Sequence, residues 1–333
     1  MAKCISIILI IFGHSSARLS IVGFLDPICV PFFFISAGYT TTGNIDLARK
    51  ARHLLIPYVV LSAICLLYTL RFHPETISTQ TLLGVVYARY SMVREHIPSQ
   101  ILLHAYNSVL WFLPALFMTY CLCKALLWIT LRVKINRWIM VAALCAISFA
   151  LTLLPVLLPW SLDTVPFFAA LMITGHIMRR DNWLGRIKIS AYLIMALAFP
   201  LLSIFFYQEN LSVGFFGGLM PVVYICGVLG ALLLLRLCQA ADRIRLLNPL
   251  CALLARINRY ALVVFGLQMV FMNYATSHIW RLHEYGQPWL SAIQSHIVGS
   301  DNTLGAYQTI FAVILGSAAG WMTERVSWRR AGR

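Results

Sequence analysis

Residues 54–71 read LLIPYVVLSAICLLYTLR, and no charged side chain interrupts the run before Arg71. A helix needs about 20 mainly apolar residues to cross the ~30 Å hydrocarbon core of a bilayer. The run approaches that length, and Arg52 and Arg71 place a cation at each end, where a membrane surface would lie. Residues 54–71 therefore predict a transmembrane helix.

Nine further apolar runs of similar length occur along the chain. Together with the first they lie at about 3–23, 27–43, 54–71, 108–130, 137–158, 163–179, 187–207, 212–235, 257–280 and 303–322. Hydrophobic residues make up 60% of the sequence and charged residues only 11%, whereas a soluble domain carries about a quarter. We therefore predict an all-α polytopic membrane bundle of about ten transmembrane helices, forming one domain over residues 1–333.

The basic residues lie in short clusters between the apolar runs. If the N-terminus is cytoplasmic, twenty of the 26 Lys and Arg residues fall on the cytoplasmic side and five on the other. This asymmetry follows the positive-inside rule and predicts a multi-pass protein of the bacterial inner membrane with both termini in the cytoplasm. The net charge of +15 is then a feature of membrane orientation, and we expect no nucleic-acid partner. Membrane lipids or a phosphorylated cosubstrate could bind the same clusters.

Two long connections, 72–107 and 281–302, fall on the outer side in this arrangement. Loops of this length are either binding elements or, as amphipathic segments, lie on the outer leaflet, and the sequence leaves both open. The nine cysteines lie almost entirely in apolar runs, and Cys121 and Cys123 have no second pair. We expect neither a disulfide framework nor a metal site.

The acidic residues narrow the class of membrane protein. All eleven fall in loops or at the ends of predicted spans, whereas ion-coupled transporters usually place carboxylates near the middle of the membrane. No internal repeat is visible, so the inverted-repeat plan of many transporters finds no support. An uncoupled transporter or flippase for a lipid-linked sugar or another amphiphile stays open.

His14 ends an apolar run and is followed by two serines. If Lys3 marks the inner face, a helix rising ~1.5 Å per residue places His14 about 16 Å into the membrane. Imidazole is well suited to take a proton from a hydroxyl near neutral pH, so His14 is a candidate general base. The alternative is a structural histidine bonded to a neighbouring helix.

Several segments together resemble the integral-membrane acyltransferase family 3, and especially its branch related to fucose O-acetylases. The residues that carry the likeness are Ala2–Ser15, Val30–Tyr39 (VPFFFISAGY), Arg49–Arg52, Leu55–Tyr58, Leu110–Phe117 (LWFLPALF) and, more weakly, Gly175 with Arg179–Arg180 and Ile257–Leu262. They span most of the chain in the family's order. One departure is Gln268, which stands where the family usually has a histidine and which cannot carry a proton.

The resemblance implies a membrane O-acetyltransferase that moves an acetyl or longer acyl group from acyl-CoA to a hydroxyl of a surface polysaccharide or lipid-linked sugar. It implies His14 as the catalytic residue and acyl-CoA as a cosubstrate, with no permanently bound cofactor. The residues that it suggests for the donor phosphates are Arg49, Lys50, Arg52, Arg179 and Arg180, each of which is equally explained as a charge that sets membrane orientation.

Four polar or aromatic residues could orient substrate, although helix packing explains each of them as well. They are Ser36, Tyr39, Trp111 and Gln268. The same Gln268 keeps open a catalytically inactive relative that only binds its ligand.

Overall fold

The computed structural model describes residues 1–15, 19–41, 44–89, 91–93, 108–133, 135–204, 211, 220–281, 291, 294–295, 297–298 and 300–331. Within these ranges the regular structure is helical, apart from one isolated bridge between Val93 and Val156. The predicted all-α class is confirmed. Parts of both outer connections, including residues 94–107 and 282–290, lie outside the described residues.

The helices follow the predicted apolar runs in order. Their bounds are α1 Ala2–Gly13, α2 Leu19–Thr40, α3 Leu47–Phe72, α4 Thr79–Tyr87, α5 Phe112–Val133, α6 Arg137–Thr152, α7 Val165–Arg180, α8 Trp183–Arg186, α9 Ile189–Ile204, α10 Met220–Ala241, α11 Asn248–Arg259, α12 Ala261–Trp280 and α14 Asp301–Ala331. In the described chain six helices, namely α3, α5, α7, α10, α12 and α14, are long and apolar enough to cross a membrane. Shorter apolar stretches lie in α1, α2, α6 and α9. The described chain thus has ten apolar helices in the order of the ten predicted runs, although two of the runs differ in their boundaries.

The predicted first span, 3–23, is wrong in its length. Helix α1 ends at Gly13, and α2 begins at Leu19 and continues through residues 24–26, where the predicted spans leave a connection. The break has a local cause, because the side chain of Ser15 donates to the carbonyl of Phe12 at 2.6 Å and so competes with further helical bonds. Helix α1 is therefore only about 18 Å long, too short to cross a bilayer alone.

The predicted span 257–280 is also divided. Helix α11 ends at Arg259, Tyr260 interrupts the helix, and α12 begins at Ala261. The hydroxyl of Tyr260 donates to the carboxylate of Glu324 on α14 at 2.7 Å, which ties the break to the neighbouring helix. The apolar run alone did not reveal this boundary because apolar residues lie on both sides of it, Ile257 before it and Ala261 after it.

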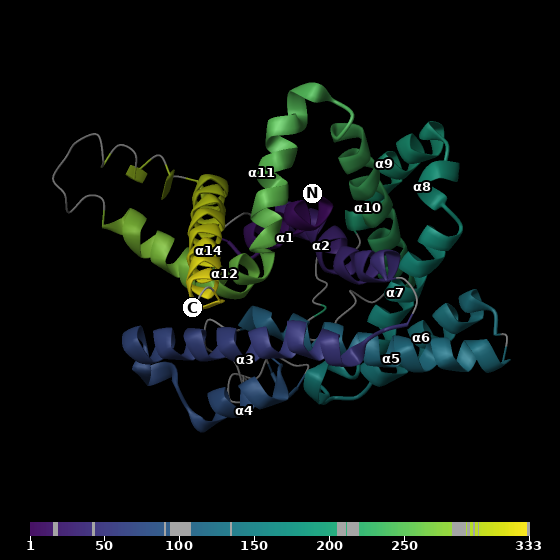
Figure 1. Cartoon of the computed structure of the whole chain (residues 1–333), viewed down its shortest axis with the longest axis horizontal. Helices are drawn as coiled ribbons and strands as arrows, with labels where there is room; N and C mark the ends of the chain where they lie inside the picture. Colours follow the sequence, from purple (N-terminus) through teal and green to yellow (C-terminus); the bar gives the residue numbers. More distant parts are fainter. Residues whose placement is uncertain are drawn as a thin grey trace.

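Helix α7 is the most deeply buried of the six long apolar helices in the described chain. It packs against α2, α5, α6 and α10, and almost its whole length is buried. In Figure 1, α1 and α2 lie in the middle of the molecule, α3 crosses below them, and α12 and α14 run side by side at the opposite end from α7. Helix α3 instead exposes a row of large apolar side chains, as expected of a helix that faces lipid.

Two glycines allow α2 and α7 to cross at very short range. A Cβ atom on Gly38 would overlap the carbonyl oxygen of Met172, and a Cβ atom on Gly175 would overlap the carbonyl oxygen of Ile35. Small residues at such crossings let two backbones approach closely, which is the main source of helix association in a bilayer. Each glycine is therefore required by the other helix.

The segment after α4 is anchored to the turn before α7. The side chains of Arg89 and Asp163 form a fully buried ion pair. The Nε atom of Arg89 also donates to the carbonyl of Leu158 at 3.2 Å, and the hydroxyl of Tyr87 donates to the carbonyl of Leu157 at 2.7 Å. These bonds hold the two segments together without an extended sheet.

We predict that Gly175→Ala destabilises the protein strongly, because the new methyl group meets a backbone carbonyl that cannot move without separating two helices. Overpacking of this kind costs about 1–3 kcal/mol or more. The measurement is the free energy of unfolding of the detergent-solubilised protein. The matched control is Gly185→Ala, whose added Cβ meets only the side chain of Asn182. Equal stability of the two variants would contradict the close crossing.

We also predict that Asp163→Ala is strongly destabilising, because it removes the carboxylate that forms an ion pair with the fully buried side chain of Arg89. Breaking a buried pair in this way costs about 3–5 kcal/mol. The double variant Arg89→Met, Asp163→Leu should recover much of the loss in a denaturant titration. The exposed pair of His73 and Glu75, 3.7 Å apart, provides the control, and Glu75→Ala should change stability little.

Candidate functional site

The two most specific sequence blocks meet in a buried aromatic cluster. The rings of Phe34 on α2 and Phe168 on α7 stack with centroids 4.0 Å apart, and Phe34 lies 5.3 Å from Phe112. Trp111 stacks on Phe168 at 6.2 Å, and Phe112 contacts Phe265 of α12 at 5.7 Å. These aromatic residues therefore connect α2, α5, α7 and α12 in one buried core.

His14 lies at the C-terminal end of α1. Its Nδ1 atom is 2.8 Å from the carbonyl oxygen of Ile10. Because a carbonyl can only accept a hydrogen bond, this contact assigns the proton to Nδ1 and leaves the lone pair on Nε2. His14 makes no other hydrogen bond within the described residues. The free nitrogen is the one that a general base requires.

The position of His14 combines depth with access. Its side chain is exposed rather than sealed by packing. It lies one helix length from Lys3 at the other end of α1, which is about 16 Å at the rise of an α-helix. A small reactant can therefore reach the ring.

The basic residues at the start of α3 differ in their contacts and in their exposure. The side chain of Asp46 caps the helix by accepting the N–H of Arg49 at 3.0 Å, and this bond holds the pKa of Asp46 below its usual range. Lys50 turns toward α5, with Nζ 4.2 Å from the centre of the Tyr120 ring. Arg49 and Arg52 stay exposed. The latter two are free to meet a ligand from solution.

The end of α7 carries the second basic cluster. Arg179 donates from Nη1 to the carbonyl of Tyr39 at 3.3 Å, which places it at the C-terminal end of α2. Arg180 holds the carboxylate of Asp181 with two bonds of 2.6 and 3.0 Å, and this contact keeps the pKa of Asp181 below its usual range. Asp181 thus neutralises part of the charge of Arg180.

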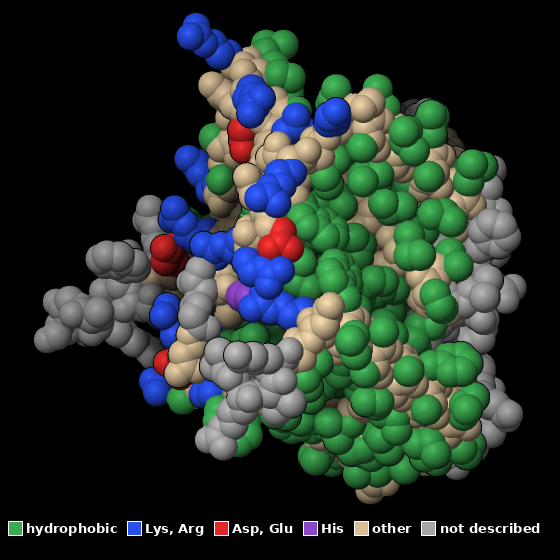
Figure 2. Space-filling model, turned by 90° about the vertical axis from the view of Figure 1, so that its right-hand side faces the viewer, with side chains coloured by type: hydrophobic (Ala, Val, Ile, Leu, Met, Phe, Trp, Pro, Cys, Tyr) green, Lys and Arg blue, Asp and Glu red, His purple; other side chains and the backbone are tan. Residues whose placement is uncertain are grey.

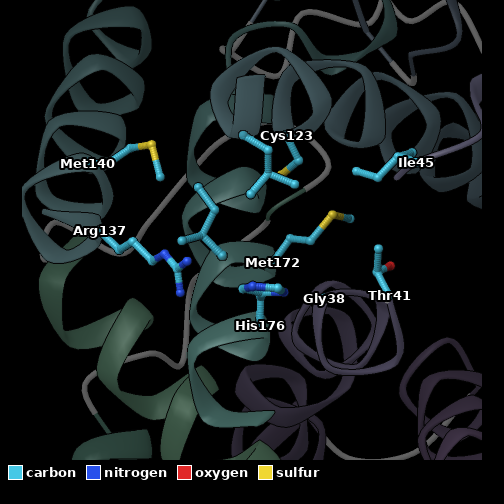
Figure 3. Close-up of a pocket in the computed structure, with 10 residues that line it drawn as sticks. Gly38, Thr41, Ile45, Cys123, Arg137, Met140, Met172 and His176 are labelled. Carbon is cyan, nitrogen blue, oxygen red and sulfur yellow. The ribbon is translucent and has the colours of Figure 1, made fainter. Parts of the chain in front are cut away.

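A pocket opens beside these residues between α2, α5, α6 and α7. Its lining consists of Gly38, Thr41, Ile45, Cys123, Leu127, Arg137, Met140, Met172, Ile173 and His176. Figure 3 shows Arg137 and His176 extending toward the same space from α6 and α7. Figure 2 shows Lys and Arg gathered along one margin of the molecule, beside a broad hydrophobic surface. The pocket therefore has an apolar interior and a cationic side.

The four residues proposed to orient substrate are placed differently, and none of them lines this pocket. Ser36 bonds within its own helix, from Oγ to the carbonyl of Phe33 at 3.0 Å. Trp111 belongs to the aromatic cluster, and Tyr39 is half-buried and supplies a carbonyl to α7. Gln268 is fully buried, and neither atom of its amide has a partner within the described chain.

Sequence reasoning missed Arg137 and His176. Arg137 counted only as one of many basic residues at the inner face, and His176 was a single histidine in an apolar run. The one available signal was the position of His176 directly after Gly175, a residue already noted beside Arg179. Only the crossing of α2 and α7 shows that this glycine places the histidine in a pocket.

The fold and these groups define a polytopic membrane protein with a reachable histidine inside the bundle and basic residues around an inner pocket. The sequence matches the family model of the acyltransferase domain, acyltransferase family 3, over residues 1–322. The protein therefore belongs to this family of membrane acyltransferases. No curated protein and no solved structure matched the chain. The likeness to the fucose O-acetylase branch stays a prediction.

Proposed function

We propose that the protein transfers an acetyl or longer acyl group from acyl-CoA to a hydroxyl of a surface polysaccharide or lipid-linked sugar at the bacterial inner membrane. The observation that carries the proposal is the state of His14, with Nδ1 engaged by a backbone carbonyl and Nε2 free and accessible. Together with membership of an acyltransferase family, this supports a general base in the interior of the bundle.

The chemistry requires one proton to move twice. Nε2 of His14 accepts the proton of the acceptor hydroxyl while its oxygen attacks the thioester carbonyl carbon. The carbon–oxygen bond forms, the carbon–sulfur bond breaks, and the departing thiolate receives the proton from the imidazolium. The bond from Nδ1 to Ile10 supports this sequence because it holds the ring in one tautomer and orientation throughout.

The distribution of charge supports a donor that enters from the basic side. Acyl-CoA is strongly anionic and needs cations at its entry site. Arg49 and Arg52 are exposed, whereas Lys50 lies against the ring of Tyr120. Arginine suits this role because its planar guanidinium binds phosphate with two donors at once. The acceptor, which is destined for the cell surface, approaches His14 from the other side.

We predict that His14→Gln abolishes acyl transfer while the protein still inserts and folds. Glutamine retains hydrogen-bonding ability but cannot carry a proton, so the rate should fall by about 10²–10⁴-fold. The measurement uses purified protein, labelled acetyl-CoA and glycans extracted from the source cells, and it counts label released by mild base. His53→Gln, an exposed histidine on α3, is the control and should remain active.

Transfer by His14→Gln at the normal rate would remove the general base from the proposal. A wild-type protein that binds donor and acceptor but forms no labelled ester would instead identify an inactive relative.

We further predict that Arg52→Ala raises the KM for acetyl-CoA and leaves the KM for the acceptor unchanged. Because Arg52 is exposed and its charge is screened by salt, the increase should be modest, about three- to tenfold, and should shrink at high ionic strength. Steady-state kinetics at two salt concentrations provide the test. An unchanged KM for the donor would exclude Arg52 from the donor site.

A further inference from the structure

The pocket between α2, α5, α6 and α7 contains a buried donor that the protein does not satisfy. Within the described residues, the Nη1 atom of Arg137 is buried and has no hydrogen-bond partner. A buried N–H group of a charged side chain is costly when it stays unpaired, because it has lost water without gaining an acceptor. In Figure 3 the guanidinium of Arg137 extends into the same space as the ring of His176.

The groups around His176 make this end of the pocket positive. Its ring experiences the charges of Arg137, Arg179 and Arg180, and of one carboxylate, Asp181. That carboxylate is already held by Arg180 through two hydrogen bonds. The positive potential from Arg137 and Arg179 therefore remains uncompensated by any acid in this group, which favours a ligand with more than one negative charge.

The rest of the pocket suits an uncharged extension of that ligand. Met140, Met172 and Ile173 line its interior. Methionine side chains are flexible and polarisable, so they adapt to a slender ligand without a fixed shape. The absent side chain of Gly38 keeps the wall on α2 open.

We propose that this pocket is a phosphate-binding site, in which Arg137 and His176 hold the phosphate group of a ligand whose uncharged part enters between Met140, Met172 and Ile173. Arg137 supplies the charged, planar donor and His176 a second ring N–H. The phosphate belongs either to the nucleotide end of acyl-CoA or to the headgroup of an anionic phospholipid. If the phosphate is that of acyl-CoA, the inference rests on the proposed function. Arg137 and His176 are then contacts for acyl-CoA in addition to the basic clusters at Arg49–Arg52 and Arg179–Arg180.

The test measures binding rather than turnover, so it does not depend on catalysis. Purified full-length protein carrying His14→Gln is titrated in neutral detergent with free CoA in one arm and with dioleoyl phosphatidate in the other. Arg137→Gln should weaken the binding of one probe by about tenfold or more, the effect expected of a lost charge-assisted hydrogen bond. The matched control is Arg243→Gln, an exposed arginine in the turn after α10.

Two further variants guard against a simple failure to fold. Arg137→Lys keeps the charge and should bind more tightly than Arg137→Gln. Leu127→Trp keeps both polar groups but fills the pocket, and it should also weaken binding, with thermal unfolding confirming that each variant is folded.

A loss of CoA binding identifies the donor as the source of the phosphate, and a loss of phosphatidate binding identifies a lipid. The proposal is overturned if the His14→Gln protein binds both probes equally with and without Arg137→Gln. It is also overturned if neither probe binds the His14→Gln protein that retains Arg137. Failure of the proposed function would look different, because CoA could still bind while no acyl ester forms.

Discussion

The backbones of α2 and α7 approach each other at Gly38 and Gly175 more closely than any side chain would allow. In a bilayer, lipid tails are as apolar as the helices, so this fit rather than hydrophobicity selects the partner helix. The aromatic cluster and the inner pocket both depend on the crossing, because each takes residues from α2 and α7. A shift of either helix would move the core and the pocket together.

The structure separates the residues that build the bundle from those available for chemistry. The aromatic rings of the two sequence blocks, such as Phe34 and Trp111, are buried against neighbouring helices. Cations and histidines instead lie near helix ends, where Arg179, Arg137 and His176 lie close together. Motifs that identify the family are thus mainly determinants of packing, and the neighbouring residues determine the charge that a ligand meets.

A backbone carbonyl near the end of α1 gives His14 its chemical character. The carbonyl oxygen of Ile10 accepts the backbone N–H of His14 at 3.0 Å and also the proton on Nδ1 of its ring at 2.8 Å. The ring is consequently held in one tautomer at the end of a helix too short to cross the membrane. This arrangement leaves an accessible imidazole at the end of a short helix, as the proposed general base requires.

The sequence by itself determined the all-helical membrane class, the order of ten apolar helices and the likeness to an acyltransferase family, because hydropathy and motif order are local properties of the chain. It also singled out His14 and the basic clusters. It did not reveal the break after Gly13, where Ser15 bonds locally to Phe12, the different contacts of Lys50 and Arg52, or the pocket at Arg137 and His176. The contact of Lys50 and the pocket depend on side chains meeting across different helices, and only tertiary packing decides which of them meet.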